Sequence, residues 1–248
     1  MNERRWMALR LAGLAAVAAL ACGCSRGSAA SGPDRFWMPF EKRSSPVLIS
    51  IPNLDAYTGR ARAEVVVTEN IVSGTDAQVA AGIASFLAAR KGSPSRLGGF
   101  PLAVSSGLPD SPMVLVGAFP YLDTPPLRNL RCAVSRSAGG SWTISERVAP
   151  WRNWTAPADL GTNAGARTYA LVTRLYDQRT GRVVLALSGI AGPATQAAAD
   201  CIMSSACLAA AVAGAPRDWD HKNLQLVLAA RMASGAPAAP KVEAVHGW

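Results

Sequence analysis

Residues 169–202, YALVTRLYDQRTGRVVLALSGIAGPATQAAADCI, decide the predicted fold class. The segment begins with two strands joined by a tight turn, in which Gly181 supplies the positive φ that such turns require. The second strand, over 183–187, is fully apolar, as expected of a central strand buried on both faces. A loop of small residues, 188–193, then leads into a helix with Pro193 in its first turn. This order of elements is typical of an α/β crossover.

The same segment carries one of two loops that predict a binding site. Residues 113–118, MVLVGA, form another apolar strand, and a loop follows it. Ligands of open α/β sheets bind beyond the carboxyl ends of the strands, and free amides at a helix N-terminus favour an anion or polar group. The predicted ligand-binding residues are Gly117, Phe119, Ser188, Gly189, Gly192, Thr195 and Gln196. In the alternative interpretation, the glycines only allow a strand and a helix to pack closely.

The rest of the chain predicts an α/β domain, Rossmann-like, with a mixed sheet flanked by helices. It forms either one lobe or two sublobes that meet near 140–165. The clearest helix begins at a capping box formed by Thr75 and Gln78 and ends near Gly92. Further strands are predicted at 47–51, 64–68, 101–105, 131–135, 141–148, 224–230 and 242–246, and short helices at 195–203 and 205–213.

Two aromatic groups each have two interpretations. FWMPF at 36–40 fits either packing on the domain or contact with a membrane surface, and packing is favoured. Trp151 and Trp154 lie in a Gly-, Pro- and Asn-rich loop, where they fit either stacking on a ligand or capping of the core, and capping is favoured.

Composition describes a folded, moderately basic protein. Half of the residues are hydrophobic and 17% are charged, which excludes a disordered chain. Of the net charge of +9, four Arg and one Glu in the first 26 residues supply +3, which leaves +6 for the body. The basic residues are scattered without interleaved aromatics, so nucleic acid is not an expected partner. A lineage bias toward Arg on a solvated surface is the favoured interpretation of this charge, and binding to anionic polymers or lipid headgroups is the alternative.

The N-terminus predicts export. Residues 11–22, LAGLAAVAALAC, are apolar and would span roughly 18 Å as a helix, which suits a signal peptide better than a full membrane span. ALAC resembles a bacterial lipobox, with Cys22 as the acylated residue and Cys24 as a poorer candidate. A lipoprotein, an uncleaved anchor and a secreted protein all remain open. Each places the body outside the cytoplasm, with 1–24 as signal or anchor, 25–35 as linker and 36–248 as the domain.

The remaining cysteines are Cys132, Cys201 and Cys207, so at most one disulfide forms among them. On one continuous helix, Cys201 and Cys207 would be about 9 Å apart by rise alone, beyond disulfide reach. They can pair only if the helix breaks at the serines between them, and burial as free thiols is the alternative.

No catalytic, cofactor or metal motif is present in the sequence. It contains no P-loop, HExxH or GxGxxG, and Ser188 does not lie in a nucleophile elbow. His221 could pair with Asp218 or Asp220, but no nucleophile is tied to it by spacing. We therefore expect no catalytic residues, no cofactor and no metal site.

Several motifs, in order, resemble an uncharacterised bacterial domain frequent in acidobacterial membrane-anchored proteins. They are FW-x-PF, PVLIS, VLVGAF, YALVTRL with RTG, GIAGPATQAAA, W-x-x-KNLQLVL and V-x-x-VHGW, spread over 36–248. The resemblance implies a domain that follows a membrane segment, and it carries no catalytic residues.

Together these observations predict an envelope-anchored, sensory-type domain that binds a small molecule or an envelope protein and is attached to the membrane through its N-terminus. A structural or assembly protein of the envelope is the alternative. A hydrolase or transferase is the least favoured class.

If the chain is a lipoprotein, its envelope localisation depends on acylation of a cysteine near the N-terminus. Replacing both Cys22 and Cys24 by Ala should then release the protein from the membrane fraction, as measured by cell fractionation. Localisation unchanged by both substitutions would contradict the lipoprotein interpretation.

Overall fold

The computed structural model describes residues 31–41, 44–52, 72–91, 94–99, 109–117, 127–128, 130–137, 141–156, 165–233, 236–237 and 239–248. Residues Gly32–Trp248 form one compact unit. The predicted segment 1–24, Cys22 and Phe119 lie outside the described residues, as do the strands expected at 64–68 and 101–105.

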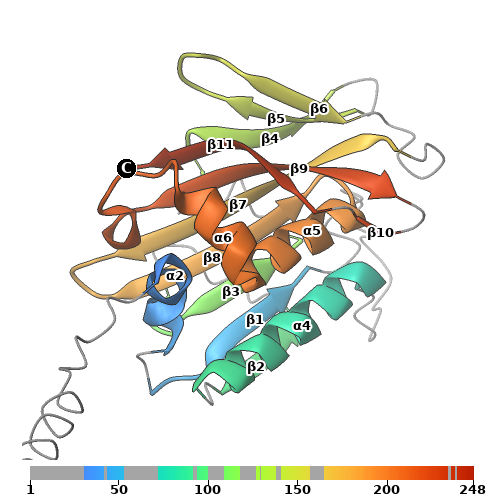
Figure 1. Cartoon of the computed structure of the whole chain (residues 1–248). Coiled ribbons are helices and arrows are strands. Elements are labelled where there is room, and N and C mark those ends of the chain that lie inside the picture. The colour runs from blue at the N-terminus through green and yellow to red at the C-terminus, as the bar shows by residue number, and fades with distance from the viewer. Residues whose placement is uncertain are drawn as a thin grey trace, which may run out of the picture. The chain divides into compact units, whose positions relative to one another are not determined.

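The main sheet confirms the predicted mixed α/β fold. Its order is β10-β9-β7-β8-β3-β1-β2, and β11 shares the outer edge of β9 with β10. Strands β2, β1, β3 and β8 are parallel, whereas β7, β9 and β11 follow in antiparallel pairs (Figure 1). The strands are β1 (Val47–Ile51), β2 (Ser95–Gly99), β3 (Met113–Val116), β7 (Arg167–Asp177), β8 (Arg182–Gly189), β9 (Leu224–Ala233), β10 (Ala236–Pro237) and β11 (Lys241–Gly247).

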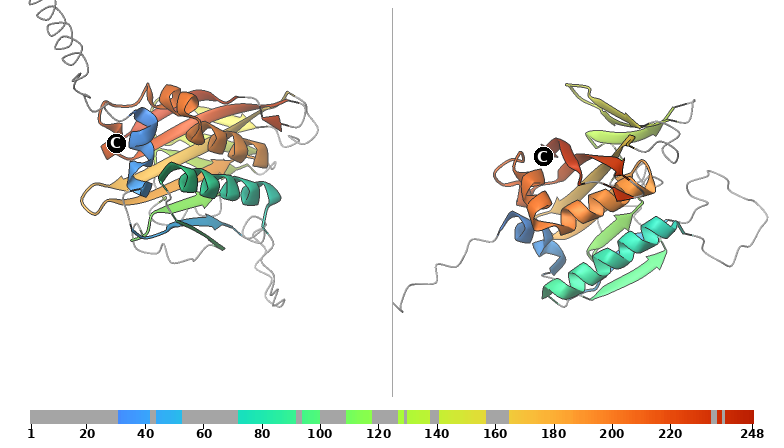
Figure 2. Two further views of the ribbon diagram at one scale, coloured as in Figure 1. Left: turned by 60° about the horizontal axis from the view of Figure 1, so that its bottom comes forward. Right: turned by 45° about the vertical axis from the view of Figure 1, so that its right-hand side comes forward.

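The helices cover one face of this sheet (Figures 1 and 2). Because side chains alternate along a strand, Val183, Leu185 and Leu187 of β8 join the core beneath the helices, while Val184 and Ala186 join a second cluster on the opposite face. The apolar run is therefore buried on both sides, as its sequence predicts. The helices are α2 (Gly32–Glu41), α4 (Gly74–Lys91), α5 (Gly192–Met203), α6 (Ser205–Val212) and the short 3-10 helix η2 (Trp219–His221).

The FWMPF segment packs on the domain, as favoured from the sequence. Helix α2 begins at Gly32, inside the segment expected as linker, and buries Phe36, Trp37 and Phe40 completely or almost so. The Trp37 indole donates a hydrogen bond to the Ile202 carbonyl oxygen at 3.0 Å, which attaches α2 to α5.

The α4 helix matches the prediction except at its cap. Val79, Ile83 and Leu87 are buried against the sheet, as the periodicity indicates. The N-cap is Ser73 rather than Thr75, because the Ser73 hydroxyl accepts from the Asp76 amide at 3.4 Å. Two serine or threonine candidates stand close together in the sequence, and the local pattern alone selects the wrong one.

A disulfide joins Cys201 to Cys207 across the break between α5 and α6. The helix ends at Met203, and Ser204 takes an extended conformation and caps α6 by accepting from the Cys207 amide. This break brings the two Cα atoms to 5.0 Å, within disulfide reach. The free-thiol alternative is therefore wrong for this pair. Closing so short a loop contributes roughly 2 kcal/mol by restricting the unfolded chain.

No single helix in the described part of the chain is long and apolar enough to cross a membrane. The pair α5 and α6 passes the same test of length and composition only when taken together, with a bend of 91° between them.

A buried arginine ties the segment before β9 to the sheet. Arg174 of β7 has no exposed surface, and its guanidinium donates to the carbonyl oxygens of Asp220 and Lys222 at 3.0 and 3.1 Å. Phe36 and Trp219 stack against it from α2 and η2. Burial lowers the pKa of Arg174 to about 10, so the side chain stays charged near neutral pH.

A three-stranded antiparallel sheet packs over β7, β9 and β11 on the face opposite the helices (Figure 2). Strand β6 lies in a stretch expected to be a loop. It buries Trp154, whereas Trp151 is 65% exposed, so the core-capping interpretation holds for Trp154 alone. The strands are β4 (Cys132–Arg136), β5 (Trp142–Glu146) and β6 (Asn153–Ala156).

Gln225 joins the two sheets by hydrogen bonds. Its side-chain amide accepts from the Cys132 N–H at 2.9 Å and donates to the Cys132 carbonyl oxygen at 3.1 Å, as a neighbouring strand would. The same nitrogen also lies 3.1 Å from the Thr173 hydroxyl. A buried amide with all these partners satisfied fixes how β4 docks on β9.

The turn between β5 and β6 is built around one buried carboxylate. Glu146 accepts two side-chain hydrogen bonds from Arg152, both at 2.9 Å, and one from Arg131 at 3.2 Å. The Arg152 hydrogen bonds are the largest cause of a Glu146 pKa lowered to about 2. Arg131 also donates to the Ala149 carbonyl oxygen at 3.0 Å, which fixes the turn from its other side.

These contacts predict acid-sensitive stability. The folded pKa of Glu146, about 2, lies below its ordinary value of 4.5, so its contribution is complete above pH 4.5 and is lost as the pH falls toward 2. The shift corresponds to roughly 3 kcal/mol of unfolding free energy. Urea unfolding at a series of pH values should show this loss, and Glu146→Gln should be less stable at neutral pH but depend less on pH. An equal pH dependence in both proteins would contradict the role of Glu146.

Candidate functional site

The two loops predicted to bind a ligand begin side by side, at Gly117 and Ser188. Strands β3 and β8 are parallel neighbours, with Val116 opposite Leu187, so Gly117 and Ser188 follow at the same carboxyl edge. Gly117 has a φ of 68°, which suits glycine and turns the chain out of the sheet. Parallel pairing thus brings together two segments that are about 70 residues apart in sequence.

Gly189 and Thr195 form a tight strand-to-helix crossover. A Cβ atom at Gly189 would lie 2.1 Å from the Thr195 backbone nitrogen, closer than any real side chain. The buried Thr195 hydroxyl accepts from the Gly189 N–H at 3.2 Å. Both residues therefore act in packing, as the alternative interpretation of this loop states.

The start of α5 offers few donors to a ligand. The amides of Ala194 and Thr195 donate to the Ala191 carbonyl oxygen at 2.9 and 3.2 Å, and Pro193 has no N–H. Gly192 faces α4, because a Cβ there would lie 2.9 Å from the Thr75 hydroxyl oxygen. The anion site expected at this terminus thus has its donors largely satisfied within the protein.

Gln196 also has an internal partner. Its side-chain nitrogen donates to the Asp200 carboxylate at 2.8 Å on the exposed surface of α5. Ser188 differs, because its hydroxyl is buried and finds no hydrogen-bond partner in the part of the chain that the structure describes. An unsatisfied buried hydroxyl is costly, so it marks a position where a polar partner would be stabilising.

Ser50 is a second such hydroxyl, on β1. It is 3% exposed, and its oxygen has no hydrogen-bond partner among the described residues. Ser50 stands level with Leu115 of β3, which joins the cluster on the face away from the helices. A polar residue therefore interrupts an otherwise apolar strand near the carboxyl edge that carries Gly117 and Ser188.

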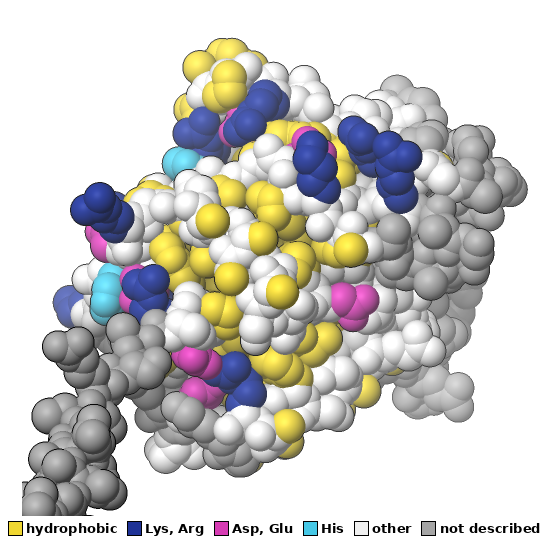
Figure 3. Space-filling model, in the orientation of Figure 1, with side chains coloured by type: hydrophobic (Ala, Val, Ile, Leu, Met, Phe, Trp, Pro, Cys, Tyr) yellow, Lys and Arg dark blue, Asp and Glu magenta, His cyan; other side chains and the backbone are white. Residues whose placement is uncertain are grey.

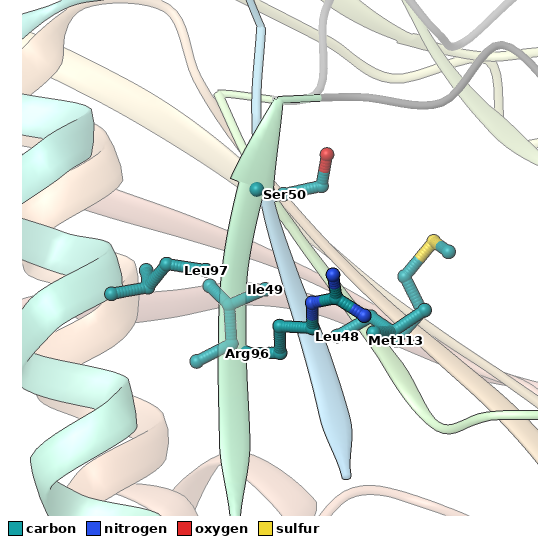
Figure 4. Close-up of a pocket in the computed structure, with 7 residues that line it drawn as sticks. Leu48, Ile49, Ser50, Arg96, Leu97 and Met113 are labelled. Atoms are coloured by element: carbon teal, nitrogen blue, oxygen red, sulfur yellow. The ribbon is translucent and has the colours of Figure 1, made fainter.

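A groove of about 300 Å³ crosses β2, β1 and β3 at Ser50. Figure 4 shows Arg96, Leu48, Met113 and Ser50 on the side of the sheet away from the helices. The pairing explains this arrangement, because Leu48 lies between Arg96 on β2 and Met113 on β3. The described lining residues are Leu48, Ile49, Ser50, Arg96, Leu97, Gly98 and Met113.

The groove combines one cation with an apolar floor. Arg96 is exposed on the edge strand β2, whereas Met113 is buried, so a ligand here would meet a guanidinium beside aliphatic and thioether groups. Arginine binds carboxylates and phosphates through two parallel hydrogen bonds. The arrangement therefore suits a small ligand with an anionic group and an apolar body.

Sequence reasoning missed this groove because it missed β2. The stretch SRLGG ends in two glycines and has no β-branched residue, so it lacks strand propensity. Parallel pairing with β1 makes it a strand nonetheless. The one available signal was Ser50, a polar residue within the apolar run VLISI.

The described residues present no activated nucleophile or metal cluster. Burial, followed by the charge of Glu146, raises the pKa of Cys132 to about 11, so this thiol stays protonated. Cys201 and Cys207 are oxidised to a disulfide, and His221 lies at the surface, 3.7 Å from Asp220. Within the part of the chain searched, no group of three His, Cys, Asp or Glu side chains could hold a metal ion.

Comparison with protein-family models and with curated proteins finds no match to this chain.

The tight contact at the crossover predicts that a substitution of Gly189 costs much more stability than the same substitution of a glycine in open space. Gly189→Ala should destabilise the fold by about 2–4 kcal/mol, because the new methyl group would overlap the backbone of α5. Gly82→Ala in α4 is the control, since its Cβ would meet only Met203 at 3.9 Å. Gly82→Ala should be stabilising by up to about 1 kcal/mol through helix propensity. Chemical denaturation measures both, and equal effects would contradict the packing role of Gly189.

Proposed function

We propose that this chain is an extracytoplasmic, membrane-anchored binding domain whose ligand is a small molecule with an anionic group and an apolar part. The observation that carries the proposal is the groove in which exposed Arg96 and the unsatisfied Ser50 hydroxyl share an apolar floor. The guanidinium would bind the anionic group, and Leu48 and Met113 would contact the apolar part.

Two observations support the proposed location. The N-terminal sequence has the length and composition of an export signal with a lipobox-like end. The Cys201–Cys207 disulfide suits an oxidising compartment outside the cytoplasm. The sequence also resembles acidobacterial domains that follow a membrane segment, and this resemblance agrees with the proposed location.

Binding is favoured over catalysis because the groove holds a recognition group without a reactive one. Arg96 is a permanent cation, and the groove's described lining contains no acid, histidine or cysteine. General acid–base or nucleophilic chemistry would require one of these groups near the bound ligand.

The assembly alternative is favoured by one feature, the edge strand β2. It ends the strand order of the main sheet, and its Leu97 is 53% exposed. An exposed sheet edge can add a strand from a partner protein. Under this alternative, Leu97→Lys should abolish co-purification with an envelope protein while the thermal stability changes little.

The ligand proposal is tested by thermal denaturation with a library of amphipathic carboxylates and phosphates. A ligand at 100 times its Kd adds about 2.7 kcal/mol to the unfolding free energy. Arg96→Ala should remove most of this stabilisation by the ligand. Arg217 is another exposed arginine, and Arg217→Ala should leave the stabilisation unchanged.

Ser50→Ala should have opposite effects on the stability of the free protein and on its stabilisation by the ligand. The free protein should become more stable by about 1 kcal/mol, because an unsatisfied buried hydroxyl is removed, while the gain from the ligand should fall. If Arg96→Ala and Arg217→Ala retained the same ligand gain, the groove would not be the binding site.

A further inference from the structure

One end of the Gly32–Trp248 unit contains both the entry of the chain and an exposed apolar group. A Cβ at Gly32 would lie 3.4 Å from Val212 at the end of α6, and one at Gly214, just beyond, would lie 3.8 Å from Val245 of β11. Strand β11 then leads directly to Trp248, which pairs with Asn223 through two backbone hydrogen bonds. This end is opposite the carboxyl edge of the parallel strands, as Figure 1 shows.

Three of the four exposed large hydrophobic side chains among the described residues lie here. Val148 and Trp151 occupy the β5–β6 turn, with 48% and 65% of their surfaces exposed, and Trp248 is 40% exposed. Val148 and Trp248 line the same recess of about 400 Å³, together with Arg131, Arg147 and His246. We call Val148, Trp151 and Trp248, with Arg147, the hairpin patch.

The turn holds this patch in a defined position. Trp151 has a φ of 59°, an uncommon conformation for a residue with a side chain, and its amide donates to the Val148 carbonyl oxygen at 3.2 Å. The Glu146 carboxylate fixes both sides of the turn through Arg131 and Arg152. The buried ion pairs of Glu146 thus hold the exposed Trp151 side chain in an unfavourable backbone conformation. Such strained positions cluster at binding surfaces, so the turn is a candidate interaction surface.

The charge around the patch is positive. Arg131 and Arg152 pair with the Glu146 carboxylate, and Arg147, the next residue in the turn, is exposed. His246 stacks on Trp248 with ring centroids 5.1 Å apart, and burial together with Arg131 lowers the pKa of His246. Figure 3 shows hydrophobic and basic side chains together at the top of the view, over the end of the β4-β5-β6 sheet.

We propose that the hairpin patch is a second membrane contact, which seats the end of the domain nearest its N-terminal entry on anionic lipid headgroups. Tryptophan prefers the interface between headgroups and acyl chains, and basic residues near a bilayer are attracted to anionic lipids. One lipid anchor becomes stable when a basic or apolar second contact is added. The inference rests on the proposed anchoring of the chain.

The test uses the full chain in lipid nanodiscs and follows hydrogen exchange of the amides at 147–152. Discs of phosphatidylcholine with phosphatidylglycerol are compared with phosphatidylcholine alone and with detergent. We expect roughly tenfold slower exchange in the anionic discs, with partial loss of this protection at high salt. Trp151→Asn, which suits the same backbone conformation, and Arg147→Glu should return exchange to the detergent rate.

Leu97→Ser is the matched control, because Leu97 is the fourth exposed large hydrophobic side chain among the described residues and lies on β2, away from the hairpin patch. It should leave the protection at 147–152 unchanged. Equal exchange in anionic discs and detergent would overturn the proposal, as would protection by an added envelope protein fraction without lipid. A chain that fails to float with the discs would instead contradict the anchoring itself, so the two failures are distinguishable.

Discussion

Strand β8 carries the pairing on which the rest of the structure depends. It is parallel to β3 on one side and antiparallel to β7 on the other, so it joins the two halves of the main sheet. Residues from Val183 to Leu187 are almost fully buried, which requires an apolar sequence on both faces. Where the strand ends, the contact between Gly189 and Thr195 directs the chain into α5 and sets the helix layer over the sheet.

This arrangement gives the domain two different ends. The carboxyl edge of β1, β3 and β8 carries the turn at Gly117 and the unsatisfied hydroxyls of Ser50 and Ser188. The opposite end carries the chain entry, the buried Arg174 and the β5–β6 turn. In our proposals, ligand recognition occurs on the open face near the first end and membrane contact at the second. A bound ligand would then remain accessible while the domain is seated on the bilayer.

Three buried polar side chains connect separate elements of the fold, and two of them do so over long distances in sequence. Gln225 binds the backbone of Cys132 across 93 residues, and Arg174 binds the carbonyl oxygen of Asp220 across 46. Glu146 brings Arg131 and Arg152 to the base of one turn. Each would be costly to bury alone, so its partners fix the relative positions of the elements. Nothing local in the sequence identifies the partners of Gln225 and Arg174, because these two contacts depend on how remote segments align.

The sequence by itself determined the elements with strong periodicity, namely the strands at 183–187 and 224–230, the helix with Val79 and Ile83, and the α/β class. Hydrophobic burial acts on local patterns, so these are visible without neighbours. Only the tertiary structure decided that SRLGG becomes the edge strand β2, that Arg96 meets the Ser50 groove, and that Gly192 and Thr195 serve packing. Strand pairing and the use of buried hydrogen-bond groups depend on residues brought together by folding, and the linear chain does not contain those distances.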